Sequence, residues 1–333
     1  MKTIVLSEKL LRLIRHDEVV KMEIRTFKGE DIDKIVNCWN VALPHDKVTK
    51  EEIIKKMLLD CNFRADGFFI ACSGDDVVGF VNCVYRRVPI DAYSGLEDNN
   101  GWISAFAIKD DKNFAEIGDA LLNAAEDYFK AHSIIEISTG YYPVYFYQGV
   151  SKEHCEKYIN LFESKGYKCI PSLARELYLT EFCEDANIEQ KREILEKEGI
   201  YTGPMQDKYI LSLIDSQEPF NNISMAFEFK SRLAELDYER IRIAAKDGKV
   251  IGVCVFGDPY GSRERFGPFS VDASYQGKGI GKVLLNDCLS AMKERGLEKA
   301  WMQWTPLQGA ADTLYKRVGF KVTKTYITFS KNI

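Results

Sequence analysis

One order of segments occurs twice along the chain, and this internal repeat limits the possible folds more than any other feature of the sequence. In each copy, strand-like and helix-like segments follow one another in the same order, with glycines at matching places. Three glycine pairs mark the two copies: Gly79 and Gly252, Gly118 and Gly281, Gly166 and Gly319. A chain of 333 residues is too long for one ordinary core and long enough for two. The repeat therefore predicts two domains that share one α/β fold.

The domain boundaries follow from where this pattern starts and pauses. We expect residues 1–21 to form a leader, residues 22–182 the first domain and residues 183–333 the second. The polar segment 183–200 is interpreted as a linker that enters a helix. In the second domain, the Asp247-Gly248 dipeptide between two apolar segments predicts a β-hairpin.

A glycine-rich loop stands between a predicted strand and a predicted helix of the second domain. Residues 275–285 read Tyr-Gln-Gly-Lys-Gly-Ile-Gly-Lys-Val-Leu-Leu. Glycines at alternate positions leave little side-chain bulk, so backbone N–H groups and the helix N-terminus can converge on one anion. Lys278 and Lys282 add positive charge. A Walker A loop requires Ser or Thr where Val283 stands, and the glycine spacing of the Rossmann motif is absent. The loop therefore predicts a diphosphate site of another class.

Two signatures in this domain resemble those of the GNAT superfamily of acyl-CoA N-acyltransferases. The spacing of Gln276, Gly279 and Gly281 is similar to the coenzyme A pyrophosphate loop of that family. Residues 311–320, Ala-Asp-Thr-Leu-Tyr-Lys-Arg-Val-Gly-Phe, resemble its second signature, in which Tyr315 takes the place of the candidate general acid. The resemblance extends over nearly the whole chain, but it is specific in the second domain and loose in the first.

The resemblance implies a fold and a set of cofactor contacts. Each domain would be a mostly antiparallel mixed sheet with a central splayed pair of parallel strands, flanked by helices. In the second domain, residues 266–271 and 300–303 would form this pair, and the acyl-pantetheine arm would lie between them. The implied cofactor-binding residues are Phe269, Ser270, Val271, Gln276, Gly277, Lys278, Gly279, Ile280, Gly281, Lys282 and Gln308.

The resemblance also suggests the catalytic groups. Tyr315 would protonate the leaving thiolate, and a carboxylate would accept the proton of the attacking amine. Glu264 lies near the start of the strand that carries such a carboxylate in many family members. Asp237, Glu239, Asp258 and a chain of water molecules remain alternatives for the base.

The first domain lacks these groups at the matching positions. A bulky ring and a carboxylate in its loop oppose a bound diphosphate by volume and by charge. We therefore expect a degenerate copy that shapes the acceptor site or acts as a packing partner. The replacements are Asn113 for Gln276, Phe114 for Gly277, Glu116 for Gly279 and Phe162 for Tyr315.

The composition limits the kinds of molecule that the protein is expected to bind. A net charge of −5 argues against nucleic acid and against an anionic membrane surface. The nine cysteines include no C-x-x-C pair, so no metal site is expected, and an odd number of thiols is typical of the reducing cytoplasm. No segment is apolar and long enough to cross a membrane.

The expected function is that of an N-acetyltransferase, which moves an acetyl group from acetyl-CoA to an amine. The acceptor is a small molecule or a peptide, and neither its identity nor the oligomeric state follows from the sequence. The alternative is a non-catalytic sensor or scaffold that binds acyl-CoA.

Overall fold

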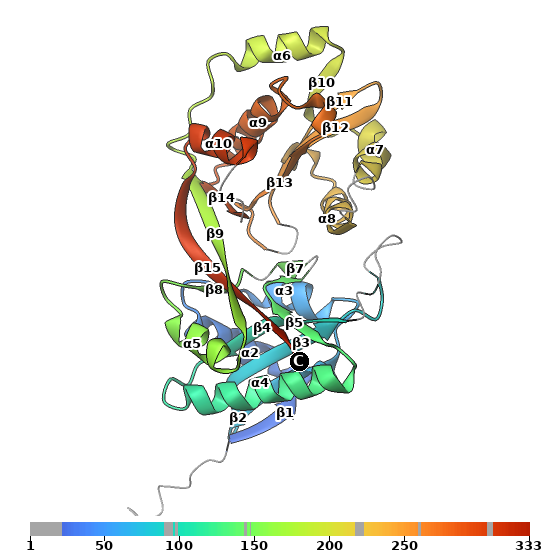
Figure 1. Cartoon of the computed structure of the whole chain (residues 1–333). Coiled ribbons are helices and arrows are strands. Elements are labelled where there is room, and N and C mark those ends of the chain that lie inside the picture. The colour runs from blue at the N-terminus through green and yellow to red at the C-terminus, as the bar shows by residue number, and fades with distance from the viewer. Residues whose placement is uncertain are drawn as a thin grey trace, which may run out of the picture.

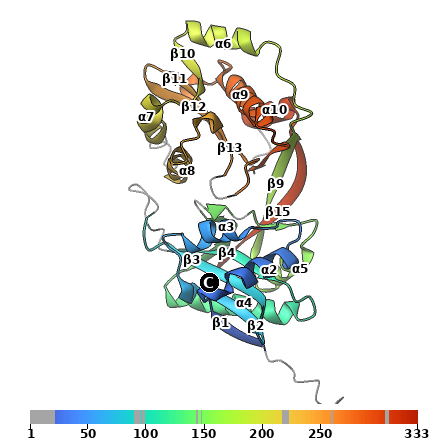
Figure 2. The same ribbon diagram turned by 180° about the vertical axis from the view of Figure 1, so that it is seen from behind.

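Two mixed α/β units, connected by a long two-stranded ribbon, make up the structure (Figures 1 and 2). This computed structural model describes residues 22–89, 96, 99–142, 145–146, 148–216, 223–258, 261–304 and 309–333. The predicted leader and the predicted cofactor residue Gln308 lie outside the described residues. The expected fold class, an α/β mixed sheet in two tandem domains, is confirmed.

The N-terminal unit follows the predicted order of strands and helices. Its edge strand β1 has only half-buried and exposed positions, whereas the central strands β3 and β4 are buried at every position except their ends. Strands β4 and β5 run parallel from the pair Asn100–Glu136 to the pair Ile103–Thr139. Its main elements are β1 (Met22–Thr26), α2 (Ile32–Ala42), α3 (Lys50–Ile53), a π-helical turn (Ile54–Leu58), β2 (Phe68–Ser73), β3 (Asp76–Tyr85), β4 (Asn100–Ile108), α4 (Phe114–Ala131), β5 (Glu136–Thr139), β6 (Tyr141–Tyr142), β7 (Tyr145–Phe146), β8 (Val150–Ser151), α5 (Glu156–Ser164) and β9 (Lys168–Tyr178).

The C-terminal unit repeats this order after an additional helix, α6. The predicted hairpin is present, and both turn residues, Asp247 and Gly248, have positive φ angles of 49° and 78°. Its main elements are α6 (Ile188–Lys197), β10 (Ile200–Pro204), α7 (Ile210–Asp215), α8 (Ile223–Leu233), β11 (Ile241–Lys246), β12 (Lys249–Phe256), β13 (Phe266–Val271), α9 (Ile280–Glu294), β14 (Lys299–Trp304), α10 (Ala310–Val318) and β15 (Lys321–Asn332).

The two units exchange their last strands. Strand β9, the last strand of the first repeat, pairs antiparallel with β14 of the second. Strand β15, the last strand of the second repeat, pairs antiparallel with β5 of the first and also with β9. Figure 1 shows β9 and β15 as the ribbon that runs between the units. The boundary between residues 182 and 183 stays a prediction, and β9 and β15 each pair with a strand from the other side of it.

Strand β15 completes the core of the N-terminal unit. Phe329 is 2% exposed, and its ring stacks on Phe162 with ring centroids 4.2 Å apart. The backbone N–H of Phe329 donates to Oγ1 of Thr139 at 2.9 Å. The C-terminal strand therefore stabilises a domain that begins about three hundred residues earlier in the chain.

Replacing Phe329 with alanine should lower the free energy of unfolding by about 3–5 kcal/mol, because it leaves a cavity in the N-terminal core. Urea denaturation followed by circular dichroism measures this change. The neighbouring Thr328, which is partly exposed on the same strand, gives the matched control. A loss below about 1 kcal/mol for F329A, similar to that of T328A, would contradict this role of β15.

Within the part of the chain that the structure describes, none of the helices has the length and apolar character needed to span a bilayer.

Candidate active site

The glycine-rich loop lies between the end of β13 and the start of α9. Gly277 and Gly279 have φ angles of +80° and +90°, the left-handed region that only glycine adopts readily. Among the described residues, apart from chain neighbours, a Cβ atom added at Gly277 would have no atom within 4 Å, and one added at Gly279 would have only the end of the Lys191 side chain, at 3.7 Å. Gln276 fixes the loop, since its Nε2 donates to the carbonyl oxygen of Val271 at 3.2 Å. The N-terminus of α9 is therefore lined by backbone and open space.

Both lysines of the loop form ion pairs with carboxylates that flank α6. Lys278 pairs with Glu198 at 2.9 Å, and Lys282 pairs with Asp185. Hydrogen bonds from these lysines lower the pKa of both carboxyl groups. Lys191 of α6 also reaches the loop. The segment interpreted as a linker thus places a third lysine near the loop, which no motif in the sequence indicates.

Within the described residues, β13 forms a β-ladder along only one of its two edges. It pairs with β12, and its contact with β14 is a single parallel bridge between Arg265 and Trp301. There the N–H of Trp301 donates to the carbonyl oxygen of Glu264 at 3.0 Å. The expected splayed pair is therefore present, joined at the start of β13 and open towards the glycine-rich loop. An unpaired strand edge of this kind binds an extended ligand as a further strand.

Tyr315 of α10 lies against this strand. Its ring centroid is 5.9 Å from that of Phe266 and 6.1 Å from that of Phe269, and the residue is 6% exposed. Burial raises the pKa of the phenol above its usual value of about 10. The hydroxyl group therefore stays protonated at neutral pH, as a proton donor must.

The four candidate carboxylates lie in two different places. Glu264 and Asp258 line a cavity of about 340 Å³ at the start of β13. Asp237 forms a two-point ion pair with Arg295, with distances of 2.6 and 2.7 Å, and does not line this cavity. Glu239 likewise lies outside it and pairs with an arginine of β11 at 3.1 Å. The structure thus brings two of the four candidates to the start of β13, where β13 and β14 separate. We call this place the splay point.

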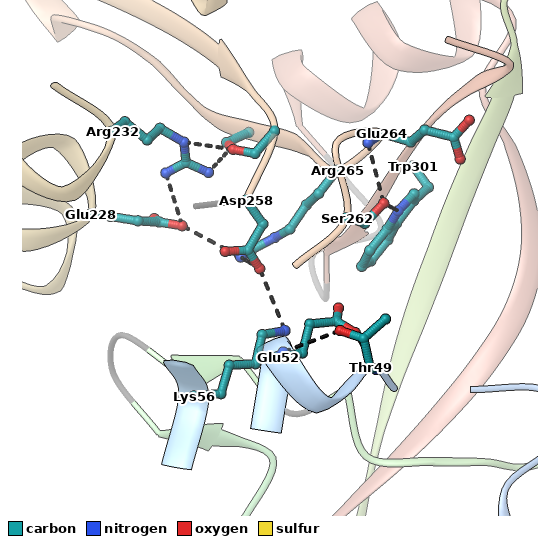
Figure 3. Close-up of polar contacts among 12 residues, drawn as sticks. Thr49, Glu52, Lys56, Glu228, Arg232, Asp258, Ser262, Glu264, Arg265 and Trp301 are labelled. Atoms are coloured by element: carbon teal, nitrogen blue, oxygen red, sulfur yellow. Dashed lines mark hydrogen bonds and ion pairs between the residues drawn. The ribbon is translucent and has the colours of Figure 1, made fainter. Parts of the chain in front are cut away.

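Glu264 and Asp258 differ in their partners, and Figure 3 shows the contact of Asp258 with Lys56. Asp258 lies 3.4 Å from Arg265 and 3.7 Å from Lys56, so it is held among cations. Oε1 of Glu264 instead accepts from the backbone N–H groups of Glu298 and Lys299, at 3.1 and 3.3 Å. A carboxylate held by neutral donors is the better candidate to receive a proton from an ammonium group.

The equivalent region of the N-terminal unit is filled by its own side chains. The hydroxyl of Tyr158 accepts from the N–H of Ile108 at 3.0 Å and donates to its carbonyl oxygen at 3.2 Å. The ring of Phe114, which replaces a loop glycine, packs edge-on against Tyr158 with centroids 4.9 Å apart. The backbone groups of β4 that match Val271 of β13 are thus bonded within the protein. Comparison of the two copies in the sequence identified Phe114 as the replacement of a loop glycine. The contact of Tyr158 with the backbone of Ile108 is visible only in the structure.

The comparisons with known proteins agree with this architecture. Residues 237–322 match the acetyltransferase (GNAT) domain, and residues 32–147 match the acetyltransferase (GNAT) family. This chain belongs to the GNAT superfamily. It holds two GNAT domains in tandem, as the sequence predicted. A sequence search of curated proteins found no match.

Solved structures show the same tandem arrangement of GNAT domains. A tandem GNAT protein from the clavulanic acid biosynthesis pathway has a TM-score of 0.66 and 11% identity, over 94% of this chain and 98% of that one. A GCN5-related N-acetyltransferase from Sphaerobacter thermophilus has a TM-score of 0.66 and 14% identity, over 93% and 95%.

A further match is the GCN5-related glucosamine N-acetyltransferase region of a fungal multi-domain β-N-acetylglucosaminidase. Its TM-score is 0.73 at 19% identity over 94% of this chain, which spans 38% of that longer protein. At these identities the likeness to all three structures shows the fold alone.

Metal ligands are not grouped in the described part of this GNAT protein. Among its described residues, no three or more His, Cys, Asp and Glu side chains are arranged to hold a metal ion.

Proposed function

We propose that this protein transfers an acetyl group from acetyl-CoA to a primary amine, and that the C-terminal domain performs the chemistry. One observation carries the proposal, the contrast between the two loops. In the C-terminal domain, Gly277 and Gly279 border open space at the start of α9. In the N-terminal domain, Phe114 and Tyr158 fill the matching place.

Each part of the site has a defined task in this proposal. The N–H groups from Lys278 to Gly281 bind the diphosphate, as helix N-termini bind anions generally. The open edge of β13 holds the pantetheine arm, and one of its backbone N–H groups stabilises the oxyanion. Glu264 receives the proton of the amine, and Tyr315 returns one to the leaving sulfur. Positioning both substrates at the splay point makes the attack effectively unimolecular.

Acetyl-CoA, a cytoplasmic setting and the sites named above are parts of this proposal. All nine cysteines are free thiols, which supports a reducing compartment. The fungal structural relative is a glucosamine N-acetyltransferase region, so D-glucosamine is the first acceptor to test.

Thiol release from acetyl-CoA, measured against a panel of amines and peptides, tests the proposed activity. We expect release that depends on one of the amines and an acetylated amine as the product. Tight binding of coenzyme A without release for any amine would instead support a sensor or scaffold.

A further inference from the structure

The cavity at the start of β13 is built by both domains, and we call it the interdomain cavity. One wall is the segment from α2 to the π-helical turn of the N-terminal domain. The opposite wall is the β12–β13 connection, and the floor is one face of the strands β14, β9 and β15. The residues that matter here are Glu52 and Ser104 from the N-terminal domain, Asp258, Ser262 and Glu264 from the connection, and Glu176, Lys299 and Trp301 from the floor.

The interdomain cavity and the glycine-rich loop lie at opposite ends of β13. The strand runs from Phe266 to Val271, which is roughly 20 Å at about 3.3 Å per residue. A diphosphate at the loop, with its pantetheine arm along β13, therefore directs the thioester towards the interdomain cavity. An acceptor must approach the thioester from the interdomain cavity, because the pantetheine arm occupies the side towards the glycine-rich loop.

Within the described part of the chain, two carboxylates on opposite walls of the interdomain cavity accept hydrogen bonds from neutral donors only. Oε2 of Glu52 accepts from the N–H and the hydroxyl of Thr49, at 2.8 and 3.0 Å. Glu264 accepts from two backbone N–H groups. Among the residues that the structure describes, neither forms an ion pair, whereas Glu176 pairs with Lys299 at 2.6 Å. Glu52 and Glu264 can therefore each bind an ammonium group without displacing a lysine.

The charge of the lining favours a ligand with one positive charge. The described lining residues include five carboxylates and four lysines, and Asp258 is already paired with Lys56 and with Arg265 behind the lining. The carboxylates are Asp46, Glu52, Glu176, Asp258 and Glu264, and the lysines are Lys47, Lys56, Lys299 and Lys324. A polyamine would meet these lysines, and like charges repel. A monoamine meets less of this repulsion.

The neutral groups in the lining favour a small ligand that carries polar groups. Trp301 is held in place by its indole N–H, which donates to Oγ of Ser262 at 3.1 Å. Oγ of Ser104 accepts from Nδ2 of Asn82 at 2.8 Å, so its own hydrogen is left to donate. A volume of about 340 Å³ is near the lower end for ligand pockets. An aromatic surface beside hydroxyl donors in this space matches a small hydroxylated amine.

We propose that the interdomain cavity is the acceptor site, and that it takes a small hydroxylated primary monoamine between Glu52 and Glu264. This inference rests on the proposed function. Glu264 removes the proton of the ammonium group, and the nitrogen lone pair attacks the thioester carbonyl. A C–N bond forms, the C–S bond breaks, and the thiolate takes the proton of Tyr315. The nitrogen, which still carries one proton more than the amide, releases that proton, and through solvent it restores the Tyr315 phenol. Glu52 orients the amine, which gives the N-terminal domain a part in substrate binding.

The test compares Glu52→Gln with the matched control Glu51→Gln in the full chain. Glutamine keeps the capping box that residue 52 forms with Thr49, so the helix start is preserved. The neighbouring Glu51 is 74% exposed and pairs with Lys55 away from the cavity. We expect E52Q to raise KM for D-glucosamine or another small monoamine at least tenfold, because a charge-assisted hydrogen bond is lost. KM for acetyl-CoA should not change, E51Q should behave as the wild type, and spermidine should be a poor acceptor.

Calorimetric titration of the same amines, with coenzyme A present, separates the two proposals. Amine binding that is weakened in E52Q and retained in E51Q supports the acceptor site even if no acetyl transfer occurs, in which case the proposed function fails alone. Equal amine affinity in E52Q and the wild type overturns the acceptor site. Lack of binding by every monoamine of the panel, or preference for spermidine, also overturns it.

Discussion

Replacing Gly279 with glutamate should abolish detectable binding of coenzyme A, with an affinity at least a hundredfold lower. Three effects act together. The φ of +90° becomes strained for any residue with a Cβ atom, at a cost of about 1–2 kcal/mol. The new side chain enters the space that the diphosphate needs. Its negative charge lies at the N-terminus of α9, where it takes the place of the anion and repels it.

A matched variant at the other end of α9 separates binding from folding. Gly296 also has a positive φ, +71°, and also has open space around it. Gly296→Glu therefore introduces similar backbone strain, but far from the loop, because a helix of 15 residues is about 22 Å long. Calorimetry with coenzyme A should show wild-type affinity for G296E and none for G279E. If G279E binds coenzyme A as the wild type does, the diphosphate is not bound at this loop.

Replacing Tyr315 with phenylalanine should lower kcat by about 10²–10⁴-fold and leave the affinity for coenzyme A unchanged. Only the hydroxyl group is removed, so the packing of the ring on Phe266, Phe269 and Phe320 is preserved. Stopped-flow measurement of thiol release gives the rate of the chemical step. Tyr167→Phe is the matched control, because Tyr167 is also buried, at 3% exposure, but belongs to the N-terminal domain.

The pH dependence gives this prediction a second observable. Burial raises the pKa of Tyr315, which favours the protonated phenol, so the proton donor is retained up to and beyond the usual tyrosine pKa of about 10. The deficit of Y315F relative to the wild type should therefore be the same at pH 7 and pH 9. A kcat unchanged by the substitution would remove Tyr315 from the mechanism. A deficit that disappears by pH 9 would mean that its pKa is lower than burial implies.

The sequence was sufficient to predict the fold of each copy. Glycines mark turns and helix starts that require a positive φ or a side-chain-free approach, and these constraints are local. The splayed pair and the glycine-rich loop could therefore be placed from the family resemblance and the repeat. The difference between the copies was also visible at Phe114, because its side chain does not fit a phosphate loop.

Features that depend on distant parts of the chain were not predictable from local pattern. Strands β9 and β15 have ordinary strand sequences, and nothing in them indicates that they are exchanged between domains. Lys191 belongs to a helix whose position beside the loop is set by tertiary packing. The partners of the four candidate carboxylates likewise became known only when the chain was folded, and those partners distinguish Glu264 from Asp258, Asp237 and Glu239.

The two domains differ in their loops and have different roles in the proposed reaction. In this account the C-terminal domain holds the cofactor, and the N-terminal domain forms one wall of the interdomain cavity. The exchanged strands β9 and β15 supply part of the floor, through residues such as Glu176 and Tyr326. Strand exchange therefore connects the N-terminal domain to the site through the chain itself and through hydrogen bonds between strands.

The most direct test of this account is a crystal structure of the full chain with coenzyme A, together with a calorimetric stoichiometry. We predict one molecule per chain, with its diphosphate against the N–H groups of residues 278–281 and its pantetheine arm along β13. A second molecule beside Phe114 and Tyr158, or a single one bound there, would contradict the account.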